Sequence, residues 1–120
     1  MAKPRVLVID DDKTIADTFV MVLNVSGFEA KAAYSGEEGL QLSRDHGFEF
    51  LVSDVVMHPM NGIEAAIEIR KLLPTCRVLL ISGTNDTTSL LAEATSRGFE
   101  FDILPKPVNP TALIEALKED

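Results

Sequence analysis

Residues 48–62 read FEFLVSDVVMHPMNG, and this stretch decides the fold of the chain. An apolar run ends at a single carboxylate, Asp54, and a loop that contains Pro59 follows before a helical pattern begins near Gly62. The run is short and continuous, which is typical of a strand covered on both faces. A buried strand that carries an acid to its carboxyl end, beside a loop, places that acid where α/β proteins bind ligands.

Short apolar runs recur on both sides of this stretch. Residues 5–9 (RVLVI) and 77–81 (RVLLI), like residues 48–53, are almost continuously apolar, which predicts interior strands of a parallel sheet. Residues 28–33 (FEAKAA) and 99–103 (FEFDI) alternate apolar and polar residues, which predicts strands at the two edges of that sheet.

Helical patterns fill the segments between and after these strands. Apolar residues recur there at helical spacing, and residues that commonly cap helices stand at the starts. We expect helices over about residues 13–26, 35–46, 62–73, 86–97 and 109–117. The expected caps are Asp12, Ser35 in a capping box with Glu38, Asn85 or Asp86, and Asn109 followed by Pro110.

Five strands that alternate with five helices over short connections predict a doubly wound α/β fold, a flavodoxin-like (βα)₅ sandwich of three layers. Among the doubly wound strand orders, 2-1-3-4-5 puts the two alternating strands at the edges. The chain has 120 residues and no linker, repeat or low-complexity segment, so we expect a single domain over residues 1–120.

The carboxyl ends of all five strands meet at one edge of such a sheet, because the strands are parallel. The polar residues expected there are Asp10, Asp11, Asp54, Ser82 and Lys106. Three converging carboxylates repel one another by about 1 to a few kcal/mol per close pair, so the cluster predicts a bound divalent cation. Oxygen ligands without His or Cys favour Mg²⁺.

A hydroxyl and an ammonium group beside this cluster would complement a phosphoryl group. The chemistry inferred from the residues is phosphoryl transfer to or from the carboxylate of Asp54, with the metal and Lys106 spreading the charge of the transition state. Taken singly, Ser82 and Lys106 are more often surface residues, and residues 10–12 are also compatible with a solvated turn and a helix cap. The inference therefore depends on their shared position.

Four motifs point to a known family. They are VLVIDDD (residues 6–12), SDVVMHPMNG (53–62), LLISG (79–83) and LPKP (104–107), and together they cover the chain in order. On these motifs the sequence resembles the receiver domains of two-component response regulators, the chemotaxis-regulator-like group. The resemblance implies a phosphoacceptor domain that switches the binding of a downstream protein through the face formed by helix four, strand five and helix five.

The resemblance also implies a role for each residue of the acidic site. Asp54 would be the phosphoacceptor, taking the phosphoryl group from a sensor histidine kinase, a phosphotransfer protein or a small phosphodonor. Asp11 would bind Mg²⁺ directly and Asp10 through water, with Asp54 and the carbonyl of Val56 as further ligands.

On the other side of Asp54, the resemblance assigns Ser82 to a hydrogen bond with the phosphoryl group and Lys106 to an ion pair with it. Gly83 would be the small residue that gives access to the phosphoryl group. Family members usually hold the bond that matches Lys106–Pro107 in cis, a geometry to which proline is suited.

Two positions depart from the family pattern. Proline is usual at the position of His58, and here it follows one place later as Pro59. The rotameric switch partner of the Ser82 position is usually Phe or Tyr, three residues before the lysine, and here it is Ile103. Output is therefore expected to travel through the loop after strand four and through helix four.

These departures keep a second hypothesis open, a constitutive protein-interaction module that has the fold but no phosphate-dependent output. A hydrolase with an aspartyl nucleophile is less favoured, because no extra acid is present to complete turnover. The domain is expected to accept and slowly lose its own phosphoryl group without acting as a turnover enzyme. Neither of the common phosphate-binding glycine patterns is present, which disfavours nucleotide binding.

The composition is that of an ordinary globular protein, with 46% apolar and 25% charged residues. A formal net charge of −8 argues against direct binding of nucleic acid or of an anionic membrane. The single cysteine, Cys76, cannot form an internal disulfide and is expected to be an inert thiol in a reducing compartment. The first apolar run is too short for a signal peptide or a membrane span, so we expect a cytoplasmic protein.

Overall fold

The computed structural model describes residues 3–83 and 87–118. The strands are β1 (Arg5–Ile9), β2 (Glu29–Ala33), β3 (Phe50–Asp54), β4 (Arg77–Ser82) and β5 (Asp102–Pro105). The helices are α1 (Lys13–Val25), α2 (Gly36–Asp45), α3 (Gly62–Leu72), α4 (Thr87–Ser96) and α5 (Pro110–Lys118). Within the described ranges, no helix has the length and apolar character needed to cross a membrane.

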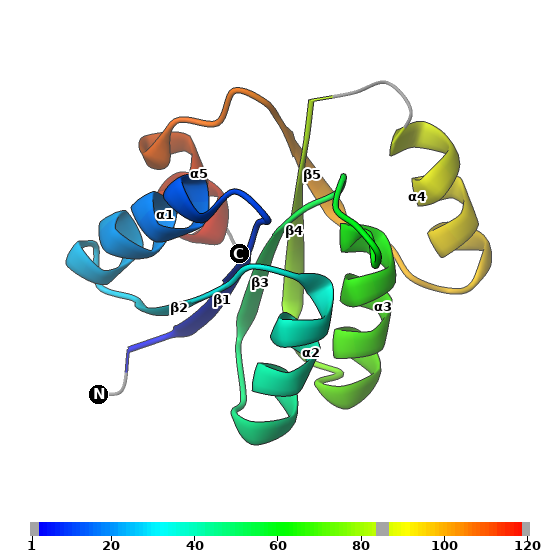
Figure 1. Ribbon diagram of the computed structural model, residues 1–120, viewed down its shortest axis with the longest axis horizontal. Coiled ribbons are helices and arrows are strands. Elements are labelled where there is room, and N and C mark those ends of the chain that lie inside the picture. Colours follow the sequence, from blue (N-terminus) through cyan, green and yellow to red (C-terminus); the bar gives the residue numbers. More distant parts are fainter. Residues whose placement is uncertain (1–2, 84–86, 119–120) are drawn as a thin grey trace.

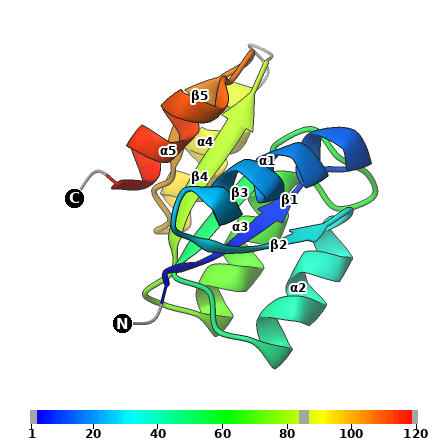
Figure 2. The same cartoon turned by 90° about the vertical axis from the view of Figure 1, so that its left-hand side faces the viewer.

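All strands are parallel and their order is β2-β1-β3-β4-β5, which confirms the predicted topology. Helices α1 and α5 cover one face of the sheet, and α2, α3 and α4 cover the other (Figure 1). The view turned by 90° shows the same separation, with α1 and α5 on one side of the strands and α2 and α3 on the other (Figure 2). The three-layer sandwich is therefore as predicted.

The interior strands are buried on both faces because alternate side chains enter two separate cores. Leu7 and Ile9 of β1 point into the core shared with α2, α3 and α4. Val6 and Val8 point into the core shared with α1 and α5. In edge strand β2, by contrast, Glu29 and Lys31 remain exposed, as their alternation with apolar residues predicts.

Strand β5 does not lie where the sequence pattern predicts it. The expected strand over residues 99–103 is wrong, because β5 begins only at Asp102. The Phe99 N–H donates to the Ala94 carbonyl and the Gly98 N–H to the Thr95 carbonyl, with Gly98 at φ +89°. This Schellman arrangement closes α4 and uses the N–H that a strand starting at Phe99 would need.

Phe99 and Phe101 therefore precede β5 and act as packing residues. Their rings stack with centroids 6.2 Å apart and an interplanar angle of 27°, and both lie against the core of the α3 and α4 side. The guanidinium of Arg70 lies 5.4 Å from the centre of the Phe101 ring. The expected start of β3 is also early, since β3 begins at Phe50.

The helix caps follow the sequence with one exception. Asp12 accepts from the backbone N–H groups of Thr14 and Ile15, and Asn109 accepts from that of Ala112, as predicted. Ser35 accepts from the N–H of Glu38 at 3.0 Å, which is also as predicted.

The capping box expected at Ser35 is nevertheless incomplete. The carboxylate of Glu38 accepts from the N–H of Tyr34, one residue too early, at 2.9 Å. The predicted caps of the fourth helix, Asn85 and Asp86, lie outside the described residues.

Cys76 is buried, and burial raises the pKa of its thiol to about 11, which agrees with an inert residue.

Candidate functional site

Asp54 ends β3 and is only 6% exposed. The chain after it returns at Gly62, whose N–H donates to the Val55 carbonyl at 2.8 Å. A Cβ atom at position 62 would overlap the backbone carbonyl of Asp54 and lie 3.0 Å from Ser53 Oγ. Ser53 Oγ in turn donates to the Asp54 carbonyl at 3.0 Å. Only glycine therefore allows the loop to close directly over the acid.

The loop between Asp54 and Gly62 is anchored by two methionines. Met57 is 2% exposed and belongs to the core on the α2, α3 and α4 side, and Met60 packs against Gly36 at the start of α2. His58 and Pro59 are exposed at the turn, and the peptide bond between them is cis. The shifted proline thus stands at the outside of the loop, between the buried Met57 and the partly buried Met60.

The end of this loop contains a feature that the sequence analysis missed. Asn61 accepts from the N–H of Glu64 at 2.8 Å, and the Glu64 carboxylate accepts from the N–H of Asn61 at 3.1 Å, which completes a capping box for α3. The spacing of Asn61 and Glu64 is the signal that could have predicted it. The cap at Asn61 fixes the place where α3 begins, at Gly62.

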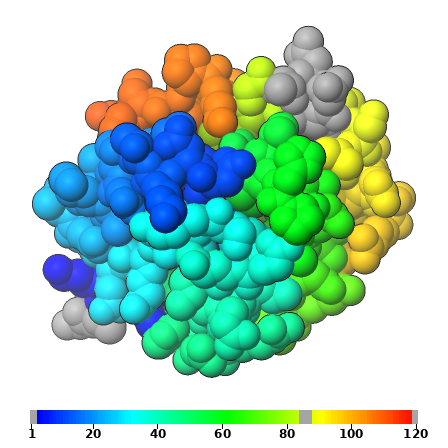
Figure 3. Space-filling model, in the orientation of Figure 1, coloured from blue at the N-terminus to red at the C-terminus, as the bar shows by residue number. Residues whose placement is uncertain are grey.

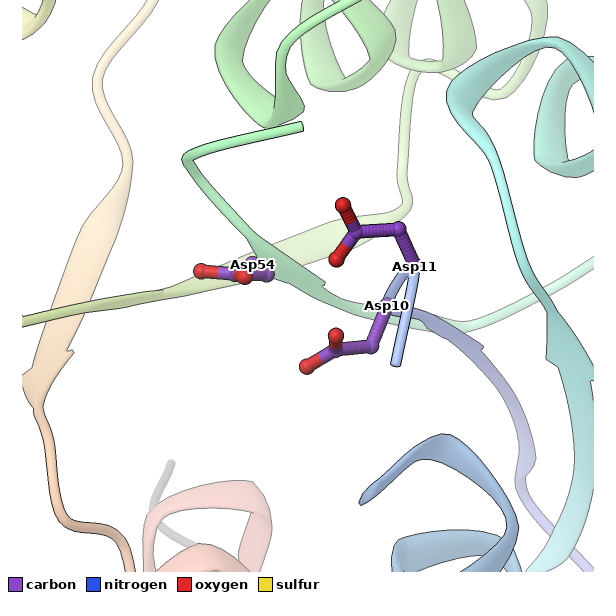
Figure 4. A group of neighbouring side chains, drawn as sticks. All are labelled: Asp10, Asp11 and Asp54. Atoms are coloured by element: carbon purple, nitrogen blue, oxygen red, sulfur yellow. The ribbon is translucent and has the colours of Figure 1, made fainter. Parts of the chain in front are cut away.

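Asp10 and Asp11 follow β1 and lie beside Asp54 (Figure 4). One oxygen of each carboxylate lies within 4.8 Å of the others, and no other such group of potential metal ligands occurs in the described part of the chain. Asp10 and Asp54 are buried, whereas Asp11 is exposed. The Asp12 N–H donates to Asp10 Oδ1 at 2.9 Å and fixes the orientation of that side chain.

Burial, together with the neighbouring acids, raises the pKa of the Asp10 carboxyl. Burial raises the pKa of its carboxyl from 3.8 to about 6, and the negative charges of Asp54 and Asp11 act in the same direction. The hydrogen bond from the Asp12 N–H and the positive charge of Lys106 partly oppose this shift. Carboxylate oxygens held this closely, without His or Cys, fit a hard divalent cation, which would offset their repulsion.

Lys106 supplies the positive charge of the site. Its Nζ lies 3.3 Å from Asp54 Oδ2, and its backbone N–H donates to the Ser82 carbonyl at 2.9 Å, just beyond the pairing of β4 with β5. The Lys106–Pro107 bond is cis, as the resemblance implies. A Cβ atom at Gly83 would lie 3.3 Å from both Cβ and Cδ of Lys106. The absence of a side chain at Gly83 therefore allows the Lys106 side chain to pass close to this backbone.

The remaining predicted residues surround these groups. Ser82 ends β4 and is 7% exposed. Val56 is half exposed in the loop next to Asp54. Ile103 pairs with Leu80 in the sheet and lies against the core of the α3 and α4 side, so it points away from the face covered by α1 and α5. The packing of Gly83 against Lys106 has no local signal in the sequence.

The sequence also matches a known protein family. Residues 6–118 match the family model described as the response regulator receiver domain. The chain belongs to this family. Receiver domains are signalling domains of two-component systems, and the recognition made from the four motifs is therefore confirmed.

Individual relatives of this receiver domain differ in length. The chemotaxis protein CheY of Thermotoga maritima is 28% identical over 116 residues, which cover 96% of this chain and 95% of the relative. The CpxR homolog of Haemophilus influenzae, a transcriptional regulatory protein, is 32% identical over 117 residues. That match covers 95% of this chain but only 48% of the CpxR homolog. The receiver domain thus spans about half the length of this relative.

A solved structure gives a comparison in three dimensions. A response regulator protein from Burkholderia pseudomallei superposes with a TM-score of 0.83 at 27% identity, covering 96% of this chain and 66% of that one. The Burkholderia structure contains a phosphorylated aspartic acid, a calcium ion and citrate. It combines the fold seen here with a modified acid and a divalent cation in one protein.

Proposed function

We propose that the domain accepts a phosphoryl group on Asp54 in a two-component phosphorelay. The observation that carries the proposal is the pairing of the buried Asp54 carboxylate with Lys106 at 3.3 Å, next to two further carboxylates. A nucleophilic carboxylate beside a fixed ammonium group is suited to phosphoryl transfer, in which the protein positions the acceptor and stabilises negative charge. The phosphorylated aspartic acid of the Burkholderia relative supports the same assignment.

In the proposed reaction, a carboxylate oxygen of Asp54 forms a bond to phosphorus. The bond between phosphorus and the donor nitrogen breaks, and its electron pair stays on the imidazole of a phosphohistidine in a sensor histidine kinase or phosphotransfer protein. Lys106 then pairs with the new phosphoryl oxygens, because the phosphorylated oxygen of Asp54 no longer carries a negative charge. We assign the hydroxyl of Ser82 to a further hydrogen bond with this group, and Gly83 to leaving space beside it.

We also propose Mg²⁺ as the cofactor, with Asp10, Asp11, Asp54 and the Val56 carbonyl as the groups that would hold it. The all-oxygen donor set and the raised pKa of the buried Asp10 support a hard divalent cation at this point. When bound, Mg²⁺ would add positive charge that stabilises the phosphoryl oxygens during transfer.

The wider assignments are proposals of the same kind. We assign residues 1–120 to one domain, place it in the cytoplasm where a kinase could reach it, and assign output to the face of α4, β5 and α5. The upstream partner we propose is a sensor histidine kinase or a phosphotransfer protein, and the downstream partner is a protein or output domain that binds this face. The half-length match to the CpxR homolog is compatible with an output module elsewhere in the same protein.

The test is covalent labelling followed by mass spectrometry. Incubation with Mg²⁺ and acetyl phosphate should add one phosphoryl group to the wild type and none to Asp54→Asn, and removal of Mg²⁺ by EDTA should prevent labelling. Lack of any Mg²⁺-dependent mass change in the wild type would favour the alternative, a constitutive interaction module. Ile103 is the residue that keeps this alternative worth testing, since no aromatic side chain stands at that position.

A further inference from the structure

Next to the acidic site, a cavity of about 520 Å³ opens between α1 and the segment that follows β5. In the space-filling view, blue α1 and the orange segment after β5 meet along one border of the surface (Figure 3). Asp10 and Lys106 stand at the charged end of this cavity. The rest of its wall is mainly apolar and includes Ile15, Phe19, Ile81, Pro107, Val108 and Pro110. We call this space the α1 cavity.

The α1 cavity is open because the residues around its mouth are short. Thr14 and Thr18 line it from α1, one helical turn apart, and both side chains are short. Gly83 lines it from the end of β4 and carries no side chain. Its volume falls within the range of small-molecule sites, which combine an apolar wall with a few polar groups.

The position of the α1 cavity relates it to the phosphoacceptor. Lys106 lines the cavity and also lies 3.3 Å from Asp54 Oδ2, and Asp10 lines it while belonging to the carboxylate cluster. A ligand with a phosphoryl group and an apolar body could place the phosphoryl group at Lys106 and the apolar body against the apolar wall of the cavity. Such a ligand is an amphiphilic phosphodonor.

We propose that the α1 cavity binds the apolar acyl group of an acyl phosphate, so that aromatic acyl phosphates are better donors to Asp54 than acetyl phosphate. This inference rests on the proposed phosphoacceptor function. In the reaction, an Asp54 oxygen bonds to phosphorus while the bond between phosphorus and the acyl oxygen breaks. The electron pair of that bond leaves on the carboxylate product, which needs no proton at neutral pH.

The size of the acyl group decides how much of the cavity is used. The methyl group of acetyl phosphate covers little apolar surface, whereas a phenyl ring can displace water from the walls formed by Phe19 and Val108. These contacts do not change as the bond to phosphorus forms, so the benefit should appear as tighter donor binding and not as a faster chemical step.

The experiment compares acetyl phosphate and benzoyl phosphate as donors, at several concentrations with Mg²⁺, by intact mass. In the wild type, the half-saturating concentration of benzoyl phosphate should be about tenfold lower than that of acetyl phosphate. Thr18→Phe, which fills the cavity from an exposed position, should abolish this advantage. Met21→Phe is the matched control, because Met21 lies on the same helix, is 67% exposed and does not line the cavity.

The two proposals fail in different ways. Equal half-saturating concentrations in the wild type, or a preference for benzoyl phosphate that survives Thr18→Phe, would overturn the cavity proposal while labelling by acetyl phosphate still supported the acceptor function. A preference lost equally in Met21→Phe would also overturn it, since that side chain lies outside the cavity. Failure of both donors to label the wild type would overturn the acceptor proposal together with the inference that rests on it.

Discussion

Gly62 lies directly against the backbone carbonyl of Asp54, although the two residues belong to different elements and are separated by a loop. The position of Asp54, the proposed phosphoacceptor, therefore depends on a residue that takes no part in the proposed chemistry. Because no side-chain atom fits between the two backbones, the dependence can be measured by adding a single methyl group.

Gly62→Ala should destabilise the fold by about 2 kcal/mol or more, because the methyl group must displace the Asp54 carbonyl. Urea unfolding measures the effect. Gly47→Ala is the matched control, since a Cβ atom there would meet no atom within 4 Å. A loss of stability as small as that of the Gly47 variant would contradict the close approach of Gly62 and Asp54.

Gly83→Ala should slow phosphoryl labelling with little effect on stability. The methyl group would lie 3.3 Å from two carbons of the Lys106 side chain and would push its ammonium group away from Asp54. Because Gly83 is exposed, the free energy of unfolding should change by less than about 0.5 kcal/mol. The labelling rate with acetyl phosphate should fall by roughly threefold to tenfold. An unchanged rate would show that the lysine side chain adjusts without moving its charge.

Asp10 should make the metal-free protein less stable as the pH rises. Its folded pKa of about 6 exceeds the ordinary value of 3.8, so the folded state holds the proton more tightly than the unfolded chain does. This stabilisation is present below about pH 4 and is lost between about pH 4 and 6, a change of up to about 3 kcal/mol.

Asp10→Asn removes this pH dependence and keeps an oxygen that can accept from the Asp12 N–H. In EDTA at pH 7, the variant should therefore be more stable than the wild type, as measured by urea unfolding. Added Mg²⁺ should stabilise the wild type more than the variant. Asp11→Asn should act in the same direction, because it also relieves repulsion among the three acids. A variant less stable than the wild type in EDTA would argue against crowded carboxylates.

Asn61→Ala should destabilise the fold by about 1 kcal/mol through loss of the cap of α3. It should also slow labelling of Asp54, because the same cap fixes the loop that closes over the acid. Asn109→Ala removes the cap of α5, outside this loop, and should cost a similar free energy without the same effect on labelling. Equal effects of both variants on labelling would show that the loop does not depend on its cap.

The fold was predictable because the pattern of apolar and polar residues along each strand indicates whether one face or both faces of that strand are buried. Continuous apolar runs identified β1, β3 and β4 as interior strands, and alternation identified the edges, which was sufficient to choose the strand order. Strand β5 was misplaced because its alternation extends into Phe99 and Phe101. The capping of α4 by the Phe99 N–H, a hydrogen bond outside the sheet, determines where that strand begins.

The residues that meet in the candidate site were also predictable, since strand order determines which carboxyl ends are neighbours. The distances between these residues were not predictable from the sequence. The contacts of Gly62 with the Asp54 backbone and of Gly83 with the Lys106 side chain join different elements of the fold, and no sequence periodicity predicts such a contact. The same holds for the α1 cavity, whose existence depends on two short threonines opposite a proline-rich segment.

The hydrogen bond from the Lys106 N–H to the Ser82 carbonyl joins the two residues proposed to hold the phosphoryl group through their main chains. A shift of the backbone at the end of β4 or β5 would change the length of that bond, because its donor and acceptor stand on the two strand ends. The exchange rate and chemical shift of one amide proton should therefore report how the ends of β4 and β5 respond to modification of Asp54. Nuclear magnetic resonance could then follow the modified and unmodified populations at equilibrium, with no probe attached to the protein.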